Sequence, residues 1–133
     1  MSGTRFAGYA AVFDRPDRGG DILRQGAFAG AGAGLPLYLG HDAGRRIGTI
    51  ERLAEDARGL RVTGISDRPV RVGQGLSFGY RVRRAATSAC GAYRELTAVD
   101  LIEISLVAHP MQPLARVVAT QDPTPEKETE DGL

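Results

Sequence analysis

The chain has 133 residues, of which 42% are hydrophobic and 25% are charged, and its formal net charge is +1. This length suits one domain with a modest core, and the composition is ordinary for a soluble globular protein. No apolar run approaches the length needed to span a bilayer, and residues 1–13 lack the basic and apolar regions of a signal peptide. We therefore expect an intracellular protein that has no membrane segment.

The residue types that bind metals and nucleic acids are sparse. A single cysteine, Cys90, excludes an internal disulfide framework and argues against a cysteine metal site, and we assign it no role. Two widely spaced histidines without a paired ligand motif predict no metal and no other cofactor. The basic residues are scattered, with short pairs at 45–46 and 83–84, and there is no tryptophan. Nucleic-acid binding usually needs a denser basic patch with interleaved aromatic residues, so we expect no direct contact with nucleic acid.

The first quarter of the chain predicts a strand, a loop and a short helix. RFAGYAAVF, residues 5–13, mixes aromatic and small apolar residues and predicts a strand with a glycine bulge or bend. The Pro, Asp and Gly residues of DRPDRGGD, residues 14–21, predict a loop. Residues 22–34, ILRQGAFAGAGAG, combine alanines, which favour a helix, with four glycines, which each disfavour it by about 1 kcal/mol. We expect a short helix there that ends in a glycine loop.

Further strand patterns recur along the rest of the chain, at residues 35–42, 46–56, 59–66, 76–85, 93–109 and 114–120. The second and third of these predict a hairpin, and the fifth is expected to be bent or divided near residues 97–100. Several short strands with frequent turn signals predict a mainly β fold with one or two short helices, either a small barrel or a compact sandwich.

The last residues differ in composition from the rest. Residues 121–133, QDPTPEKETEDGL, contain five acidic residues against one lysine, a net charge of −4, and almost no apolar residue. Such a segment cannot bury enough apolar surface to fold. We expect one domain at residues 1–120 and a disordered acidic tail at 121–133. This tail either engages a partner or is removed by self-cleavage, or it serves only as a solubilising extension.

Few polar residues stand where they could carry chemistry. Ser77 lies in GLSFGY, between Gly75 and Gly79, while His41 and His109 each follow an apolar strand. A serine hydroxyl becomes an effective nucleophile when a histidine accepts its proton and a third polar group orients the histidine ring. Glycines beside the serine would permit the close approach of a substrate carbonyl. The same residues also have a plain structural explanation, as a strand serine, turn or bulge glycines and solvated histidines.

A candidate third group lies in the segment VDLIEISLV. Strand alternation places Leu101, Glu103 and Ser105 on one face, and a carboxylate within such an apolar run is costly to bury unless it has a partner. Glu103 could pair with a histidine or simply with an arginine. Asp100 is the other acidic residue of the segment.

The order of the segments carries a resemblance. GYAAVFDRPDRGGDI, HD…IG, GLSFGYR and LIEISLVAHPM follow one another, and over residues 5–118 the chain resembles the phage prohead protease family. These serine proteases mature the capsids of tailed phages and gene transfer agents. The resemblance implies a small β-barrel with helices, similar to the herpesvirus assemblin protease. It also implies that the protein cleaves the scaffold, or the scaffolding segment of the major capsid protein, and the protease itself. This cleavage would take place inside the procapsid, in the cytoplasm of the host cell.

The resemblance also assigns roles residue by residue. Ser77 matches the family nucleophile, His41 matches the general base, and Glu103 occupies the acidic position of the matching segment. The herpesvirus relatives use a second histidine as the third member, which makes His109 a rival for that role. Asp100 is a weaker rival.

Two expectations concern substrate and activity. Gly75 and Gly79 are expected to leave room for a substrate strand added to an open sheet edge. Residues 66–75 are a short connector where family members usually carry a longer helical segment, and this supports a rival hypothesis, a non-catalytic capsid assembly or scaffolding factor. An unrelated small β-barrel binding module would require the motif order to be a coincidence. The compact chain and the AHPM segment favour a gene transfer agent as the source, and a homo-oligomer is one of the states left open.

Overall fold

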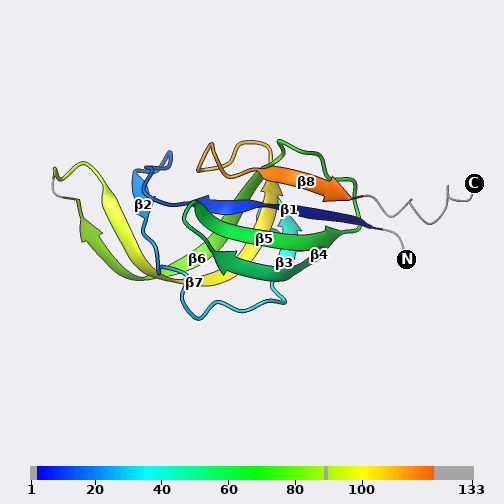
Figure 1. Ribbon diagram of the computed structural model, residues 1–133, viewed down its shortest axis with the longest axis horizontal. Helices are drawn as coiled ribbons and strands as arrows, with labels where there is room; N and C mark the ends of the chain where they lie inside the picture. Colours follow the sequence, from blue (N-terminus) through cyan, green and yellow to red (C-terminus); the bar gives the residue numbers. More distant parts are fainter. Residues whose placement is uncertain (1–2, 89, 122–133) are drawn as a thin grey trace, which may run out of the picture.

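The computed structural model describes residues 3–88 and 90–121, which form eight strands in one mixed sheet (Figure 1). The strands are β1 (Thr4–Val12), β2 (Asp21–Leu23), β3 (Pro36–Leu39), β4 (Asp42–Glu55), β5 (Gly59–Ser66), β6 (Gly75–Thr87), β7 (Arg94–Val107) and β8 (Val117–Gln121). Their order is β2-β7-β3-β4-β5-β1-β8, and β6 pairs with the other edge of β7. The expected mainly β fold is confirmed.

Three of the seven pairings between the described strands join consecutive strands, and the other four join segments far apart in the sequence. β4 and β5 form the expected antiparallel hairpin, and β1 lies between β5 and β8 with a bulge after Tyr9. β7 is one continuous strand, although its pairing with β6 shifts register three times. β7 also runs parallel to β2, at residues 94–96, and to β3, at residues 104–106, and both lie on the edge opposite β6. The short strand β2 falls in a segment that the sequence predicted to be loop and helix.

The prediction of a closed barrel is wrong, because the sheet is open. β6 and β8 meet only at the start of β6, where Gly75 bridges Arg116 and the Leu76 N–H donates to the Ala115 carbonyl at 2.9 Å. Beyond this point β6 follows β7 away from the body of the sheet (Figure 1). A barrel requires every strand to have two neighbours along its length, and β6 has only one.

The predicted short helix at residues 22–34 is also wrong, since the described residues contain no helix. This segment forms β2 and then successive turns, in which the N–H groups of Ala27, Ala29 and Ala31 donate three residues back. Gly26 and Gly30 have φ values of 90° and 85°. A right-handed helix cannot continue through left-handed residues, so glycines at this spacing stop the chain at single turns.

The core lies between the inward faces of the curved sheet. Its largest fully buried side chains include Leu37, Ile50, Leu60, Val62, Leu76, Ile104, Leu106 and Val117, and β1 adds the smaller Ala10 and Ala11. The inner part of β7 contributes both apolar and polar residues to this core, because Glu103 and Ser105 are buried beside Ile104 and Leu106. Burial of two polar side chains in a core requires partners for both.

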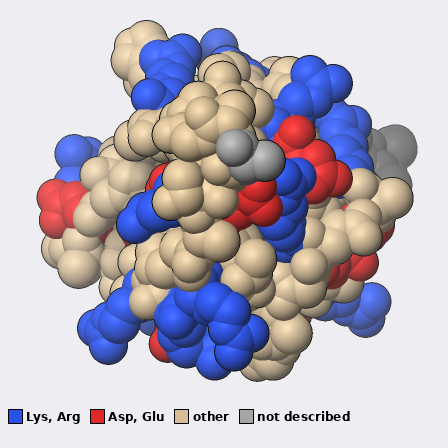
Figure 2. Space-filling view, turned by 90° about the vertical axis from the view of Figure 1, so that its left-hand side faces the viewer, with Lys and Arg blue, Asp and Glu red and all other residues tan. Residues whose placement is uncertain are grey.

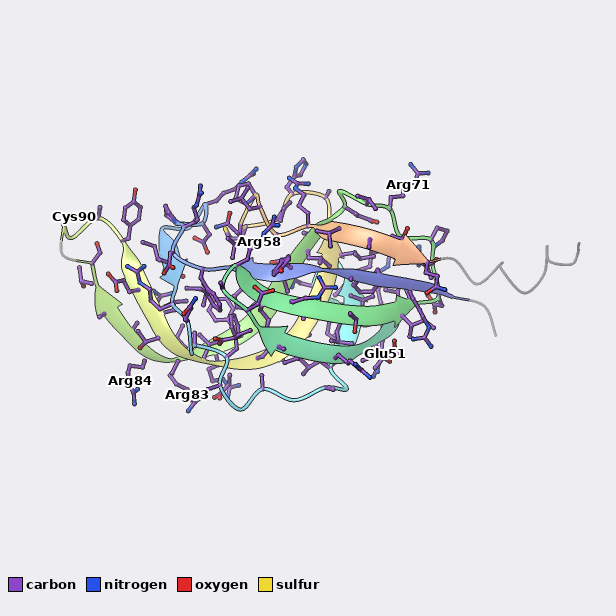
Figure 3. The ribbon with its side chains drawn as sticks, in the orientation of Figure 1. Glu51, Arg58, Arg71, Arg83, Arg84 and Cys90 are labelled. Atoms are coloured by element: carbon purple, nitrogen blue, oxygen red, sulfur yellow. The ribbon has the colours of Figure 1, made fainter. Side chains whose placement is uncertain are left out.

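The outer part of the β6–β7 hairpin projects from the body. We call residues 81–87 of β6 and 94–100 of β7 the hairpin arm. Figure 1 shows it extending away from β3, β4, β5 and β8, and only β2 pairs with it, at residues 94–96. Viewed from the end that carries the arm, the surface shows arginine side chains around the periphery with acidic side chains between them (Figure 2). Arg83 and Arg84 point away from the arm, and Cys90 lies at its tip (Figure 3).

Gln121, the first residue of the predicted tail, belongs to β8 and pairs with Arg5, and the division into domain and tail stays a prediction. Residues 122–133, the remainder of the predicted acidic tail, lie outside the described residues.

Candidate active site

His41 is presented by the turn that joins β3 to β4. Leu39 pairs with Asp42, and the two residues between them, Gly40 and His41, both have a φ of 63°. Positive φ at both central residues is the signature of a type I′ hairpin turn. Glycine adopts this conformation freely, whereas a histidine adopts it at a cost of about 1 kcal/mol or more. His41 is one of two non-glycine residues with positive φ in the described chain.

The ring of His41 contacts the carboxylate of Glu103. The distance from His41 Nδ1 to Glu103 Oε2 is 2.6 Å, and the side chains are 41% and 8% exposed. Since a carboxylate only accepts hydrogen bonds when it is ionised, Nδ1 carries the proton in this contact and Nε2 is left as an acceptor. The ring thus has one nitrogen on a buried carboxylate and one available for a reacting proton.

Gly79 makes room for Glu103 on the neighbouring strand. The two residues are paired in the β6–β7 register, and a Cβ added at position 79 would overlap the Glu103 carboxylate. The glycine therefore allows the carboxylate to lie across β6 toward His41. At Gly75 the ring of Pro110 and the carbonyl of Val107 fill the equivalent space. The substrate-binding role expected of the two glycines stays a prediction, and each glycine has a packing reason in the fold.

Ser105 connects the backbone of His41 to the same carboxylate. Its hydroxyl donates to Glu103 Oε1 at 2.7 Å and accepts the backbone N–H of His41 at 3.0 Å. The side chain of Ser105 is fully buried. The sequence placed Ser105 on the same face as Glu103 but assigned it no role, and the two-residue spacing was the only signal that could have suggested one.

Ser77 and His41 line one cavity. Ser77 is half-buried on β6, where it is paired with Ser105 in the strand register. The cavity has a volume of about 140 Å³. Its remaining walls come from β1, β2, β6 and two loops, and consist of Ala10, Ala11, Val12, Arg15, Asp17, Asp21, Leu23, Leu76, Phe78, Tyr80, Met111 and Gln112.

Within residues 3–88 and 90–121, no hydrogen bond joins the Ser77 hydroxyl to the His41 ring. Catalytic contacts of this kind are commonly long in the absence of substrate and shorten when it binds. The arrangement therefore offers a serine hydroxyl and an oriented imidazole at one cavity, with a buried carboxylate behind the imidazole. These are the parts needed to deprotonate a hydroxyl as it attacks a carbonyl.

Asp21 and Tyr80, which both line the cavity, are joined by a hydrogen bond, and Arg94 pairs with Asp21 from outside the lining. Arg94 donates from two nitrogens to Asp21, at 2.9 and 2.8 Å, and the Tyr80 hydroxyl donates to the same carboxylate at 3.2 Å. The hydrogen bonds from Arg94 lower the pKa of Asp21 below its usual value of 3.8. Burial, and then the charge of Asp21, raise the pKa of Tyr80. The carboxylate of Asp21 at the cavity wall is therefore ionised, and the charge of Arg94 balances it.

The two rivals for the third role lie elsewhere. Asp100 is on the hairpin arm, where its carboxylate is 2.8 Å from Arg83 Nε and both side chains are about half exposed. His109 is exposed in the loop after β7, does not line the cavity, and forms no hydrogen bond or ion pair with any described residue. Of the three candidates, the fold brings Glu103 alone into contact with His41.

Residues 3–88 and 90–121 include no cluster of three or more His, Cys, Asp or Glu that could hold a metal ion. Within the same residues there is no helix long and apolar enough to cross a membrane.

The sequence profile of the caudovirus prohead serine proteases matches residues 1–128. The chain belongs to this family. The resemblance inferred from the motif order is therefore confirmed. No curated protein sequence matches the chain.

The fold is similar to that of the KSHV protease, whose structure was solved in complex with a hexapeptide phosphonate inhibitor. The two structures align with a TM-score of 0.57 and 15% sequence identity, over 90% of this chain and 65% of the KSHV chain. The expected likeness to a herpesvirus protease is thus confirmed at the level of fold. This chain spans 65% of the length of the KSHV protease.

Proposed function

We propose that the chain is a serine endopeptidase in which Ser77 is the nucleophile, His41 the general base and Glu103 the residue that orients His41. The observation that carries this proposal is the contact of 2.6 Å between His41 Nδ1 and the buried carboxylate of Glu103, at a cavity that Ser77 also lines. Membership of the prohead serine protease family supports it independently.

The proposed reaction follows from this geometry. Ser77 Oγ attacks the carbonyl carbon of the scissile peptide bond, and His41 Nε2 accepts the hydroxyl proton. His41 then returns the proton to the amine that leaves, and an acyl ester forms on Ser77. Water, deprotonated by the same histidine, hydrolyses the ester. Throughout, Glu103 holds Nδ1–H and stabilises the positive charge that appears on the ring.

The free edge of β6 supports an extended peptide as substrate. From Ser77 onward, the backbone groups of β6 pair only with β7 within the described chain. An unpaired strand edge can accept a peptide as an additional strand, which would carry the scissile bond past Ser77. The inhibitor in the KSHV structure is a hexapeptide phosphonate, which is consistent with peptide binding at such a fold.

The substrate that we propose is the scaffold, or the scaffolding segment of the major capsid protein, cleaved inside the procapsid during maturation, together with the protease itself. This assignment rests on membership of the caudovirus prohead protease family. A gene transfer agent as the source, and a homo-oligomeric state, stay predictions.

Two measurements test the proposal, and the first needs no knowledge of the substrate. The chain is incubated with a fluorophosphonate probe, which phosphonylates activated serines, and the modified residue is located by mass spectrometry. We expect labelling at Ser77 in the natural sequence, none in Ser77→Ala, and much slower labelling in His41→Ala. Equal labelling of Ser66→Ala and the natural sequence is the control, because Ser66 is a buried serine on β5 away from the cavity.

The second measurement addresses the substrate. The chain is co-expressed with the major capsid protein encoded beside it, with the natural sequence and with Ser77→Ala, and the mass of the capsid protein is determined. Shortening with the natural sequence alone is expected. A full-length capsid protein in both cultures, with shells formed and no probe labelling, would instead establish the non-catalytic assembly factor.

A further inference from the structure

We propose that Ser105 is a positioning residue of this site: its hydroxyl holds His41 in the left-handed turn and fixes the Glu103 carboxylate on the histidine ring. The inference rests on the proposed function in that it concerns the general base of the proposed protease. Nothing in the family match or in the likeness to the KSHV protease bears on Ser105.

The contacts of Ser105 form a closed ring of hydrogen bonds. His41 donates its backbone N–H to Ser105 Oγ at 3.0 Å, and Ser105 donates to Glu103 Oε1 at 2.7 Å. Glu103 Oε2 in turn lies 2.6 Å from Nδ1 of the same histidine. These three hydrogen bonds connect the imidazole of His41 to the backbone of the same residue through the buried side chains of Glu103 and Ser105. They therefore restrict both the rotation of the His41 side chain and the rotation of the carboxylate.

The backbone conformation of His41 explains why such a tie is needed. A φ of 63° is unfavourable for a residue with a side chain, and the turn is therefore poised to relax to a conformation that moves the ring. In the observed conformation the His41 N–H donates to Ser105 Oγ at 3.0 Å, and this hydrogen bond stabilises that conformation. The β3–β7 pairing supports it on one side, where the Gly40 N–H donates to the Leu106 carbonyl at 3.0 Å.

The position of Ser105 in the sheet also fits this role. It lies on β7 between Tyr38 of β3 and Ser77 of β6, its register partners on the two sides. It is thus the central residue of three adjacent strands, one of which leads to His41 and one of which carries Ser77. A hydroxyl at this point is fully buried, and both of its hydrogen bonds within the described chain go to the proposed base and its carboxylate.

Ser66 provides a matched comparison. It is also a fully buried serine in a strand, but its hydroxyl accepts only the backbone N–H of Arg68, at 3.0 Å, and contacts neither His41 nor Glu103. If Ser105 were only a satisfied core serine, the loss of either hydroxyl would affect stability and leave the site unchanged.

The test compares Ser105→Ala with Ser66→Ala and the natural sequence in the full chain. The first readout is the rate of fluorophosphonate labelling of Ser77. We expect Ser105→Ala to slow labelling by about 10- to 100-fold, the effect of one hydrogen bond to a charged group, while Ser66→Ala labels at the natural rate. The second readout is the low-field proton resonance of His41 Nδ1–H, assigned by its absence in His41→Asn.

The resonance is expected to persist in Ser66→Ala and to broaden or move toward that of a solvent-exposed imidazole in Ser105→Ala. An unshifted resonance together with natural labelling in Ser105→Ala would overturn the proposal. If Ser105→Ala fails to fold, Ser105→Cys decides the matter, because the thiol preserves the shape but is a weak donor. Reduced labelling and a shifted resonance in Ser105→Cys support the role, and natural values of both contradict it.

The two readouts also separate this proposal from the proposed function. If the natural sequence reacts with no probe and cleaves no capsid protein, the protease proposal fails. The resonance would still show whether Ser105 orders His41, because it requires no catalysis.

Discussion

Two carboxylates on one strand show how differently the body and the arm of the β6–β7 hairpin use an acidic residue. Glu103 and Asp100 are three residues apart on β7, and each contacts a nitrogen at almost the same distance, 2.6 Å to His41 and 2.8 Å to Arg83. The Glu103 side chain is 8% exposed, whereas the Asp100 side chain is 54% exposed. The distances alone do not distinguish the two pairs, but the burial does.

Burial changes what a contact of this kind can do. An exposed ion pair in water is worth about 0–1 kcal/mol and is easily exchanged for solvent. A buried carboxylate has no water to replace a lost partner, so its remaining contacts dictate where its oxygens point. Glu103 can therefore hold one orientation of His41, whereas the exposed pair of Asp100 and Arg83 exchanges easily with solvent.

The sheet explains why the body and not the arm contains the site. Where β7 passes Ser105, it has β6 on one side and β3 on the other, and β3 leads directly into the turn of His41. Along residues 97–103, no described strand pairs with β7 opposite β6, although the Val99 N–H donates to the Ala27 carbonyl at 3.0 Å. Residues 94–96 of the arm also have two neighbours, β6 and β2, but only at residues 104–106 is the second neighbour β3, the strand that leads to His41.

The largest expected effect comes from exchanging the two carboxylates for amides. We expect Glu103→Gln to lower the rate of Ser77 labelling and of cleavage by about 10³- to 10⁴-fold, because an amide no longer fixes the tautomer of His41 or balances its positive charge. Asp100→Asn should leave both rates unchanged. The rates are measured with the fluorophosphonate probe and with the capsid protein.

His109→Ala provides a third arm of this experiment and should resemble Asp100→Asn. If His109→Ala or Asp100→Asn lost activity while Glu103→Gln kept it, the contact between Glu103 and His41 would be structural. The third member would then have to reach His41 through a rearrangement.

An intermediate effect is expected from Gly79→Ala. The added Cβ would overlap the Glu103 carboxylate and force it away from His41, at a cost of about 1–3 kcal/mol in stability. Labelling of Ser77 should fall more than the loss of folded protein explains. Urea unfolding and probe labelling, measured on the same samples, give the two numbers.

Gly32→Ala is the matched control for that substitution. Gly32 has no atom within 4 Å of an added Cβ and no positive φ, so the change should raise stability slightly, by about 0.5 kcal/mol, and leave labelling unchanged. Natural activity in Gly79→Ala would show that the glycine is not needed for the orientation of Glu103.

The sequence predicted the strands better than their arrangement. Alternation and turn residues located seven of the eight strands, and they placed Glu103 and Ser105 on the same face of β7. They could not predict that β7 runs parallel to β3, because parallel pairing joins segments more than 60 residues apart and leaves no local pattern. This pairing is what brings His41 to Glu103.

The incorrect predictions have local causes. Alanines at residues 22–34 favoured a helix, but Gly26 and Gly30 adopt left-handed backbone conformations that no propensity scale reports for a particular fold. The open sheet could not be distinguished from a barrel, because closure depends on whether β6 and β8 pair beyond one bridge. The role that we propose for Ser105 was missed because a serine two residues from a glutamate is common in strands.

The smallest expected effect on the site is that of Asp21→Asn, although it removes an ion pair. Arg94 would lose a bidentate carboxylate partner that joins β2 to the start of β7, which should cost about 1–2 kcal/mol of stability at neutral pH. Labelling of Ser77 should not change, because the contact between His41 and Glu103 does not involve β2. Urea unfolding and the fluorophosphonate probe measure the two effects.

The pH dependence of that stability loss identifies its cause. Because Arg94 lowers the pKa of Asp21 in the folded chain, the ionised carboxylate stabilises the fold fully above its usual pKa of 3.8. This contribution is lost as the pH falls through the lower value of the folded state, since Asp21 then takes up a proton in both states. The difference in unfolding free energy between the natural sequence and Asp21→Asn should therefore be constant near neutrality and shrink below pH 3.8. A difference that stays the same in acid would mean that packing of β2, and not the charge of Asp21, joins the arm to the body.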